Sequence, residues 1–317
     1  MSALIQAQHL HRHYADTHAV DDVSIHLQQG DILGLLGPNG AGKSSCMQML
    51  CGVLAPSAGE ILINGIDLLD KPQQAKQHIG YLPDKPPLYP ELSVNEYLNY
   101  AARLRRVPNA QLSTLHEQAK QRCGLKGHGK RLIGNLSKGY QQRVGIAQAI
   151  IHQPDIIILD EPTVGLDPVQ MREIRHLITE LGEQHGIILS THILPEVQAV
   201  CNQVQLIHQG KSVFNKSMHD IQQHEKVLIH LQQPLTVQSL LKLPSVESIE
   251  NVDAHRYLLN GNNLQQSLTE ISQYCVAQNW GLREIHLQEN SLEQIFINLT
   301  TGEDASSNRT EQKVAAL

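Results

Sequence analysis

A glycine-rich segment near the N-terminus carries the residue types that hold phosphate groups. It fits the pattern G-x-x-x-x-G-K-[ST] and is followed by one more serine, so that its members are Gly37, Pro38, Asn39, Gly40, Ala41, Gly42, Lys43, Ser44 and Ser45. Backbone N–H groups of such a loop point at phosphate oxygens, and glycines let the backbone approach closely. Lys43 would hold the β- and γ-phosphates, and the Ser44 hydroxyl would ligate Mg²⁺. The segment predicts a site for a nucleoside triphosphate.

Three further polar residues stand where two apolar runs end. Asp160 and Glu161 follow the run 156–159, and His192 follows the run 186–190. Asp160 is the expected second anchor for Mg²⁺, and Glu161 is placed to polarise an attacking water. His192 can donate a hydrogen bond to a phosphate. These residues predict hydrolysis of the bound nucleotide.

The elements that must position these residues follow from periodicity. Residues 31–37 read as a buried strand before the loop, and apolar residues recur at helical spacing after it, at Met47, Leu50, Cys51 and Leu54. A helix N-terminus at the loop favours a bound anion. The β-branched run 156–159 is typical of a central parallel strand, and the carboxyl ends of parallel strands line a ligand crevice. We therefore expect an α/β fold that brings the loop, both carboxylates and the histidine together.

Composition restricts the partners. The formal charge of −6 and a pI near 6.3 argue against binding to nucleic acid or directly to an anionic membrane. Five cysteines without a C-x-x-C pair and the absence of a secretory signal favour the reducing cytoplasm. No apolar run approaches the eighteen or so residues of a spanning helix, so any membrane role must use a separate protein.

The chain divides by pattern into three parts. Residues 3–220 form the expected nucleotide-binding domain, in which 93–152 are a helical insertion that opens with a Ser93/Glu96 capping box. Residues 225–300 are expected to form a small α+β domain in the order βαββαβ, which resembles a ferredoxin-like unit. Its helices are expected at 236–241, 264–278 and 291–299. Residues 301–317 are polar without periodicity and are expected to be disordered.

Five segments together resemble a known family. Gly37–Ser44, Leu136–Tyr140, Ile156–Pro162, Gly165–Pro168 and Ser190–His192 look like the Walker A, signature, Walker B, D-loop and H-loop motifs of ABC-transporter ATPases. They occur in that family's order and cover roughly residues 3–215. The resemblance implies a P-loop NTPase fold of ABC type, with ATP and Mg²⁺ as cofactors and ATP hydrolysis as the activity.

The same resemblance implies a head-to-tail dimer with two ATP molecules at its interface. Ser137 and Gly139 would contact the γ-phosphate held by the other subunit, within a signature segment made of Leu136, Ser137, Lys138, Gly139 and Tyr140. Asp167 would cross the interface. Tyr14 lies between the short strands expected at 3–9 and 23–27. The resemblance implies that Tyr14 stacks on adenine, whereas the residue alone is as consistent with an ordinary tyrosine at a strand edge.

Two positions depart from the family pattern. The signature is usually Leu-Ser-Gly-Gly-Gln, and here Lys138 and Tyr140 replace a glycine and the glutamine. Asp84 follows Tyr-Leu-Pro where a glutamine is usual. An ionised carboxylate can ligate Mg²⁺ but cannot donate a hydrogen bond as an amide can. Asp84 is therefore either a third Mg²⁺ ligand or a position where that role has weakened.

The stretch 81–98 and the segment 291–300 look like the ATPases of ABC-2 type exporters, including a group linked to gliding motility. This implies a subunit at the cytoplasmic face of the membrane that drives a separate integral-membrane permease. One alternative is a soluble ABC ATPase that acts on a macromolecular partner, and another is a nucleotide-gated module with weak turnover. The single cassette and the absence of heptads disfavour the first alternative, and Glu161 and His192 disfavour the second.

Overall fold

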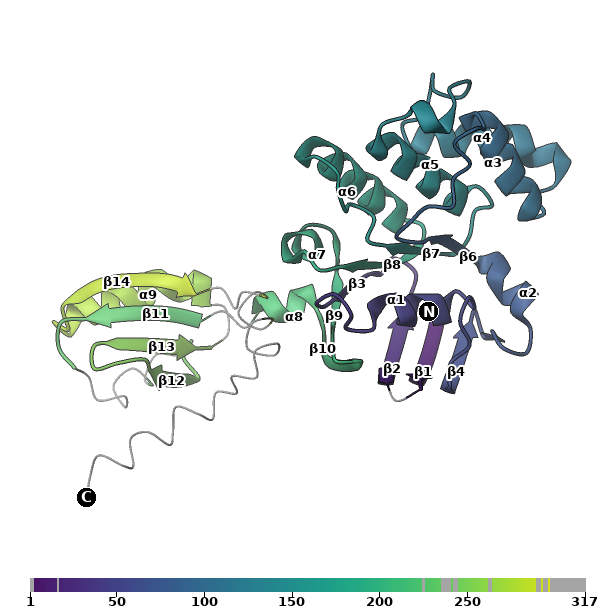
Figure 1. Ribbon diagram of the computed structural model, residues 1–317. Helices are drawn as coiled ribbons and strands as arrows, with labels where there is room; N and C mark the ends of the chain where they lie inside the picture. The colour runs from purple at the N-terminus through teal and green to yellow at the C-terminus, as the bar shows by residue number, and fades with distance from the viewer. Residues whose placement is uncertain are drawn as a thin grey trace. The chain divides into compact units, whose positions relative to one another are not determined.

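The computed structural model describes residues 3–15, 17–223, 226–234, 241, 245–261, 264–288, 292 and 296. The chain forms two compact units, residues 1–215 and 216–317 (Figure 1). The division falls within the strand β10 (Lys211–Ser217). Each unit has its own hydrophobic core. The nucleotide-binding motifs all belong to the first unit.

A six-stranded sheet forms the centre of the first unit. Its strand order is β10, β9 (Gln203–His208), β3 (Ile32–Leu36), β8 (Gly186–Thr191), β7 (Ile156–Asp160) and β6 (Ile79–Leu82). The strands from β9 to β6 are parallel to one another. Every residue of β3, β7 and β8 is buried, which is why these strands are almost continuously apolar in the sequence. The buried strands predicted at 31–37, 156–159 and 186–190 are thereby confirmed.

A second, antiparallel sheet lies on the other side of the helix that follows the phosphate loop. Its order is β2 (Thr17–Leu27), β1 (Ile5–Tyr14), β4 (Ala58–Ile63) and β5 (Ile66–Asp67). The helix α1 (Lys43–Leu50) packs between the two sheets, as Figure 1 shows. Met47 of α1 shares one buried cluster with Ile5 and Ile63 of the antiparallel sheet and with Leu35 and Ile158 of the parallel sheet. The loop is therefore anchored in the core through its own helix.

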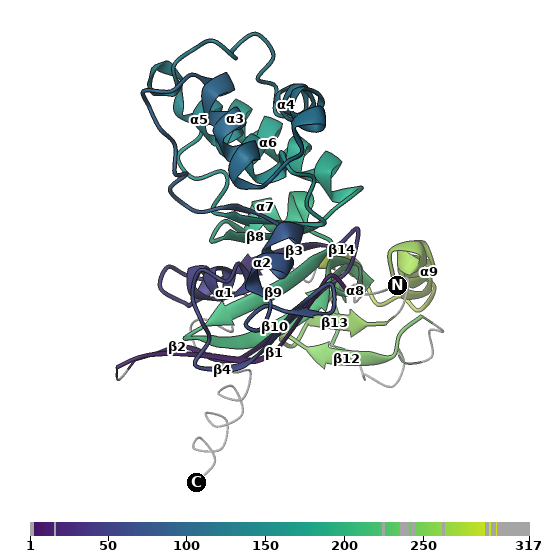
Figure 2. The same ribbon diagram turned by 90° about the vertical axis from the view of Figure 1, so that its right-hand side faces the viewer.

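Three helices form a subdomain beside the parallel sheet. They are α3 (Val94–Leu104), α4 (Asn109–Arg122) and α5 (Lys138–Ile150), which pack against one another, while α5 also contacts β6 (Figure 2). Ser93 and Glu96 form the predicted capping box at the start of α3. The short helix α2 (Pro72–Ala75) precedes β6.

Two helices cover the sheet near β3 and β8. They are α6 (Pro168–Gly182), which contacts β8, and α7 (Leu194–Val200), which contacts β3 and β8. The packing of α7 is close at Gly34, where an added Cβ would lie 2.9 Å from Sγ of Cys201. All five cysteines of the chain are free thiols in buried positions, as their reduced state predicts.

The second unit begins with α8 (Met218–Gln223) and contains a four-stranded antiparallel sheet. The strand order is β12 (Ser248–Asn251), β13 (Arg256–Asn260), β11 (Lys226–Leu231) and β14 (Leu282–Gln288), with α9 (Leu264–Ala277) packed against β11 and β14. This order agrees with a ferredoxin-like unit. Most of the helix expected at 236–241 and most of that expected at 291–299 lie outside the described residues, as does the tail 301–317. The ferredoxin-like assignment therefore stays a prediction.

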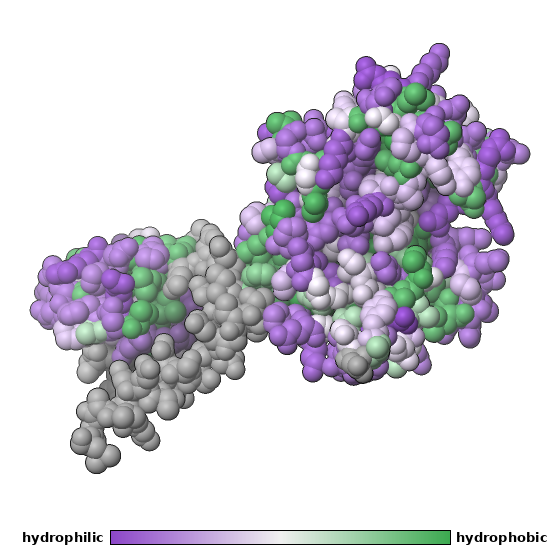
Figure 3. All heavy atoms as spheres, in the orientation of Figure 1, coloured by the Kyte–Doolittle hydropathy of each residue, from purple (hydrophilic) through white to green (hydrophobic). Residues whose placement is uncertain are grey.

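Hydrophilic side chains predominate on the face of the first unit that Figure 3 shows, with apolar groups scattered among them. Within the described part of the chain, no helix combines the length and the apolar character that crossing a bilayer requires.

Candidate functional site

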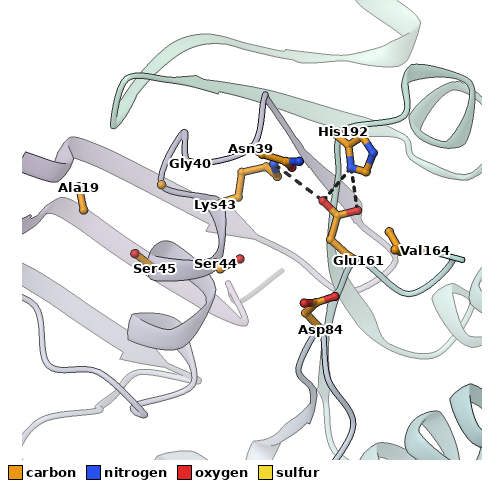
Figure 4. Close-up of a pocket in the computed structure, with 11 residues that line it drawn as sticks. Ala19, Asn39, Gly40, Lys43, Ser44, Ser45, Asp84, Glu161, Val164 and His192 are labelled. Carbon is orange, nitrogen blue, oxygen red and sulfur yellow. Dashed lines mark hydrogen bonds and ion pairs between the residues drawn. The ribbon is translucent and has the colours of Figure 1, made fainter.

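Several of the residues predicted to act on a nucleotide line one pocket of about 430 Å³, which Figure 4 shows in close-up. It lies beyond the carboxyl ends of β3, β7 and β8, where an open parallel sheet places its ligands. The lining residues are Ala19, Asn39, Gly40, Gly42, Lys43, Ser44, Ser45, Asp84, Glu161, Val164 and His192. The phosphate loop, one predicted carboxylate and the predicted histidine are therefore brought together, as is Asp84.

Lys43 lies almost wholly out of solvent at the first turn of α1, with 5% of its surface exposed. Its Nζ donates hydrogen bonds to the carbonyl oxygens of Gly37 at 2.7 Å and Pro38 at 3.1 Å. Burial lowers the pKa of this ammonium group, and the nearby carboxylates of Glu161 and Asp160 oppose that shift. A poorly solvated positive charge gains more than a solvated one from a bound phosphate.

Gly42 is one position where the loop requires glycine. Its φ is +107°, and an added Cβ would lie 2.3 Å from the carbonyl oxygen of Ala19 in β2. The antiparallel sheet therefore approaches the loop so closely that a side chain at this position would displace its backbone.

Asp160, the last residue of β7, is buried beneath the loop. Its Oδ1 accepts hydrogen bonds from Ser44 Oγ at 3.3 Å and from Ser190 Oγ at 2.5 Å. A hydroxyl and a carboxylate at this separation are hard oxygen donors of the kind that Mg²⁺ prefers. The donor set therefore fits Mg²⁺, with Ser44 and Asp160 as the residues that would hold it.

Glu161 adopts a backbone conformation that is uncommon for a residue with a side chain. Its φ is +48°, in the left-handed region, which costs on the order of 1–3 kcal/mol unless the surroundings impose it. Its backbone N–H donates to Ser190 Oγ at 2.9 Å. The carboxylate oxygens both lie 3.1 Å from His192 Nδ1, and Oε1 is 3.8 Å from Lys43 Nζ (Figure 4). This conformation turns the carboxylate into the pocket instead of along the strand.

Asp84 and Tyr14, two other predicted site residues, differ in their relation to the pocket. Asp84, shortly after β6, is exposed and lines the pocket, with its carboxylate directed toward Glu161 in Figure 4. Tyr14 does not line the pocket. It was expected between the first two strands, but β1 is longer than its sequence pattern indicated and Tyr14 is its last residue. The ring is 44% exposed and has the Arg12 guanidinium 4.6 Å from its centroid.

None of the signature residues Leu136–Tyr140 lines the pocket of its own chain. Ser137 is the N-cap of α5, where its Oγ accepts from the N–H of Tyr140 at 3.5 Å. Gly139 is packed so tightly that an added Cβ would lie 2.1 Å from Oε1 of Gln170 in α6. Asp167 is the N-cap of α6 and accepts from the next helical N–H groups at 2.9 and 3.0 Å.

Three residues of the site were not predicted as site residues. Ala19 and Val164 line the pocket, and Ser190 connects Asp160 to the backbone of Glu161. Ser190 carried one usable signal, since it is a polar residue at the end of a strand that is otherwise apolar. Ala19 and Val164 carry no chemical signal of their own.

The loop follows β3 at the carboxyl edge of a parallel sheet, and the acidic pair stands at the end of β7, on the other side of β8. This arrangement defines a P-loop nucleotide-hydrolysing protein. The sequence model of the family described as ABC transporter matches residues 20–164. The ABC transporter ATP-binding protein NatA of Bacillus subtilis is 38% identical over 210 residues, covering 66% of this chain and 85% of NatA.

Two further comparisons extend this result. The bacitracin transport ATP-binding protein BcrA of Bacillus licheniformis is 30% identical over 315 residues, covering 95% of this chain and 99% of BcrA. A solved structure of an ATP-binding subunit of an ABC transporter superposes with a TM-score of 0.63 at 30% identity, covering 69% of this chain and 92% of that one. The chain belongs to the ABC transporter family as an ATP-binding subunit, and its activity is ATP hydrolysis coupled to transport.

Proposed function

We propose that this chain drives an ABC-2 type exporter by closing on ATP with a second copy of itself. The observation that carries the proposal is the incompleteness of the site. One chain supplies the phosphate loop, Glu161 and His192, while the signature residues stand at the N-terminus of α5 and contribute nothing to their own pocket. Ser137 is exposed there, at a helix end that favours an anion. A second copy, placed head to tail, would complete each pocket.

Within each pocket the proposed roles follow from geometry. Lys43 binds the β- and γ-phosphates. The role of Tyr14 in stacking on the base rests on the family resemblance, since Tyr14 does not line the pocket. Glu161 accepts the proton of the attacking water at one carboxylate oxygen, and His192 holds that carboxylate through Nδ1 at 3.1 Å. Ser44 and Asp160, with Asp84 as a third oxygen donor, would hold Mg²⁺. The ion, when bound, supplies positive charge that offsets charge developing on the phosphate oxygens.

The exporter assignment rests on the similarity to BcrA, a bacitracin transport protein, which extends through the second unit as well as the first. A protein that couples ATP to transport without a spanning helix in its described part needs an integral-membrane partner. We place the chain at the cytoplasmic face of the membrane, bound to a separate permease. The specificity for the transported molecule would then belong to the permease.

Replacement of Glu161 by glutamine tests the paired site. Glu161→Gln keeps the side-chain shape but removes the proton acceptor, so kcat for ATP should fall by roughly 10²- to 10⁴-fold. Because bound ATP is then retained, the variant with ATP should sediment and scatter light as a dimer.

Lys43→Ala is the matched control, since it removes the phosphate contact and should give neither hydrolysis nor dimer. A monomeric Glu161→Gln variant at saturating ATP would contradict the paired site.

A further inference from the structure

A buried carboxylate lies outside the pocket, on α7. Glu196 is 3% exposed and does not line the site. Its Oε1 accepts a hydrogen bond from the hydroxyl of Thr163, and its Oε2 accepts one from the hydroxyl of Thr191 at 2.7 Å. Nη2 of Arg175 in α6 is 3.7 Å from Oε1. Both threonines are themselves buried. A carboxylate is costly to bury unless it is hydrogen-bonded in this way, so the position demands an explanation.

The two threonines flank the residues that are proposed to act on water. Thr163 follows Glu161 by two residues, and Thr191 immediately precedes His192. Thr191 Oγ1 also accepts from the N–H of Ile193 at 3.0 Å, which fixes the backbone just beyond the histidine. Glu196 therefore connects the two segments whose side chains meet at 3.1 Å in the pocket.

Three consecutive residues, Ser190, Thr191 and His192, each connect the end of β8 to the segment around Glu161. Along the end of β8, Ser190 bonds the carboxylate of Asp160 and the backbone of Glu161, and His192 bonds the carboxylate of Glu161. Thr191 lies between them and points to the opposite side of the strand, where Glu196 links it to Thr163. The turn that holds Glu161 in its left-handed conformation is thus fixed at both of its ends, by Ser190 before the turn and by Glu196 after it.

We propose that Glu196 is a positioning residue for ATP hydrolysis, which sets the separation and orientation of Glu161 and His192 through Thr163 and Thr191. This inference rests on the proposed roles of Glu161 and His192. It assigns Glu196 no contact with nucleotide, and therefore predicts an effect on the hydrolytic step and none on ATP binding.

Glu196→Gln in the full-length chain is the direct test. An amide oxygen can accept hydrogen bonds but the amide nitrogen cannot, so one of the two threonine contacts is lost while the volume is unchanged. Displacement of catalytic groups by a fraction of an ångström to 1 Å lowers kcat by about 10- to 100-fold. The dissociation constant for a fluorescent ATP analogue should change by less than about twofold, because the loop is untouched. Glu180→Gln, on the exposed side of α6, is the matched control and should resemble the natural chain.

A second variant separates positioning from folding. Thr163→Val removes one hydroxyl and keeps the shape, so it should lower kcat in the same way. The unfolding temperature should fall by a few degrees, because Oε1 of Glu196 loses a hydrogen bond, while the chain stays folded at the assay temperature. If the two residues act through one contact, Glu196→Gln combined with Thr163→Val should lower kcat by less than the product of the two separate effects. Should Glu196→Gln fail to fold, Thr163→Val alone carries the test.

The outcomes distinguish this inference from the proposed function. An unchanged kcat in a folded Glu196→Gln variant, with Glu161→Gln inactive, would overturn the positioning role alone. A loss of kcat and of ATP binding in step, in proportion to the folded fraction, would also overturn it. Full activity in Glu161→Gln would instead remove the proposed catalytic assignment on which the inference depends.

Discussion

Lys43 sets the electrostatic character of the site. Its ammonium group is almost fully buried, its pKa is lowered by that burial, and two loop carbonyls take its hydrogen bonds. In the proposed role of Lys43, bound phosphate would offer this group the full negative charge that the carbonyl oxygens lack. Because a buried ion gains most from such a partner, we expect Lys43 to favour a triphosphate over a neutral ligand.

Asp84 gives a prediction at the same scale. It lines the pocket as an exposed carboxylate, at the position where the family pattern that the sequence resembles has a glutamine. A carboxylate ligates Mg²⁺ more strongly than an amide oxygen does. Asp84→Gln should therefore raise the Mg²⁺ concentration that gives half-maximal ATPase activity, by about threefold to tenfold.

The measurement is a Mg²⁺ titration of steady-state hydrolysis at constant ATP, with Asp70→Asn, an exposed carboxylate outside the pocket, as the control. Identical titration curves for Asp84→Gln and the natural chain would exclude a special role for Asp84.

The residues that sequence could identify are those whose signal is local. Lys43 and Ser44 belong to an eight-residue pattern, and Asp160 and Glu161 stand out as charges after an apolar strand. Ala19 enters the pocket only because β2 crosses beside Gly42, a contact that no spacing encodes. Glu196 shares this character, because its partners lie on two other segments and are visible only after folding.

At the scale of elements, α5 connects two segments that are proposed to act on ATP. Its N-terminus presents Ser137, and its C-terminal half holds β6, the strand that precedes Asp84. Gln148 Nε2 donates to the carbonyl of Tyr81 at 2.7 Å, and His152 Nε2 lies 3.1 Å from the carbonyl oxygen of Ile79. A shift of α5 would therefore move β6 with it.

His152 makes this connection sensitive to acid. Burial, with a smaller contribution from the Arg105 guanidinium, lowers the pKa of His152 to about 4. In the unfolded chain the pKa of this histidine is about 6.5, so between pH 4 and pH 6.5 the unfolded chain binds more protons than the folded chain does. The contribution of His152 to the free energy of unfolding is therefore fully present above about pH 6.5. It is lost as the pH falls toward 4, by up to about 3 kcal/mol.

His152→Gln provides the comparison, since it can still donate to Ile79 but does not titrate. The difference in unfolding free energy between the natural chain and this variant, measured by urea denaturation, should decrease steadily from pH 7 to pH 4.5. His176→Gln, exposed on α6, is the background control. A difference that stays constant with pH would show that His152 is not the responsible group.

Elements with strong periodicity or end signals were predicted closely, such as α3, which begins at its capping box. The length of β1 was not. Its register against β2 is irregular around Leu10 and Arg12, and these irregularities interrupt the alternation that marks a strand. The strand nevertheless continues to Tyr14, a residue that the sequence pattern placed in the connection between the first two expected strands.

At the scale of the whole molecule, the nucleotide pocket belongs to one of the two units. Every residue that lines the nucleotide pocket belongs to the first unit, and the second unit has its own core around Val227, Ile229 and Leu259. A chain that ends at residue 223 should therefore fold and hydrolyse ATP at a rate within about twofold of the full chain.

Steady-state hydrolysis and circular dichroism of the shortened chain check this expectation. A folded but inactive product would show that the second unit takes part in the reaction.

The buried thiols give the two units separate chemical reporters. Burial raises the pKa of Cys46, Cys123 and Cys201 to about 12 and that of Cys275 to about 11, so the folded chain resists thiol-modifying reagents. Cys275 belongs to the second unit, and the other four cysteines belong to the first. The rate at which a maleimide modifies Cys275 therefore reports the opening of the second unit, and its rate at the other cysteines reports the opening of the first unit. Because the natural thiols react slowly, a thiol introduced by Lys138→Cys would be modified first.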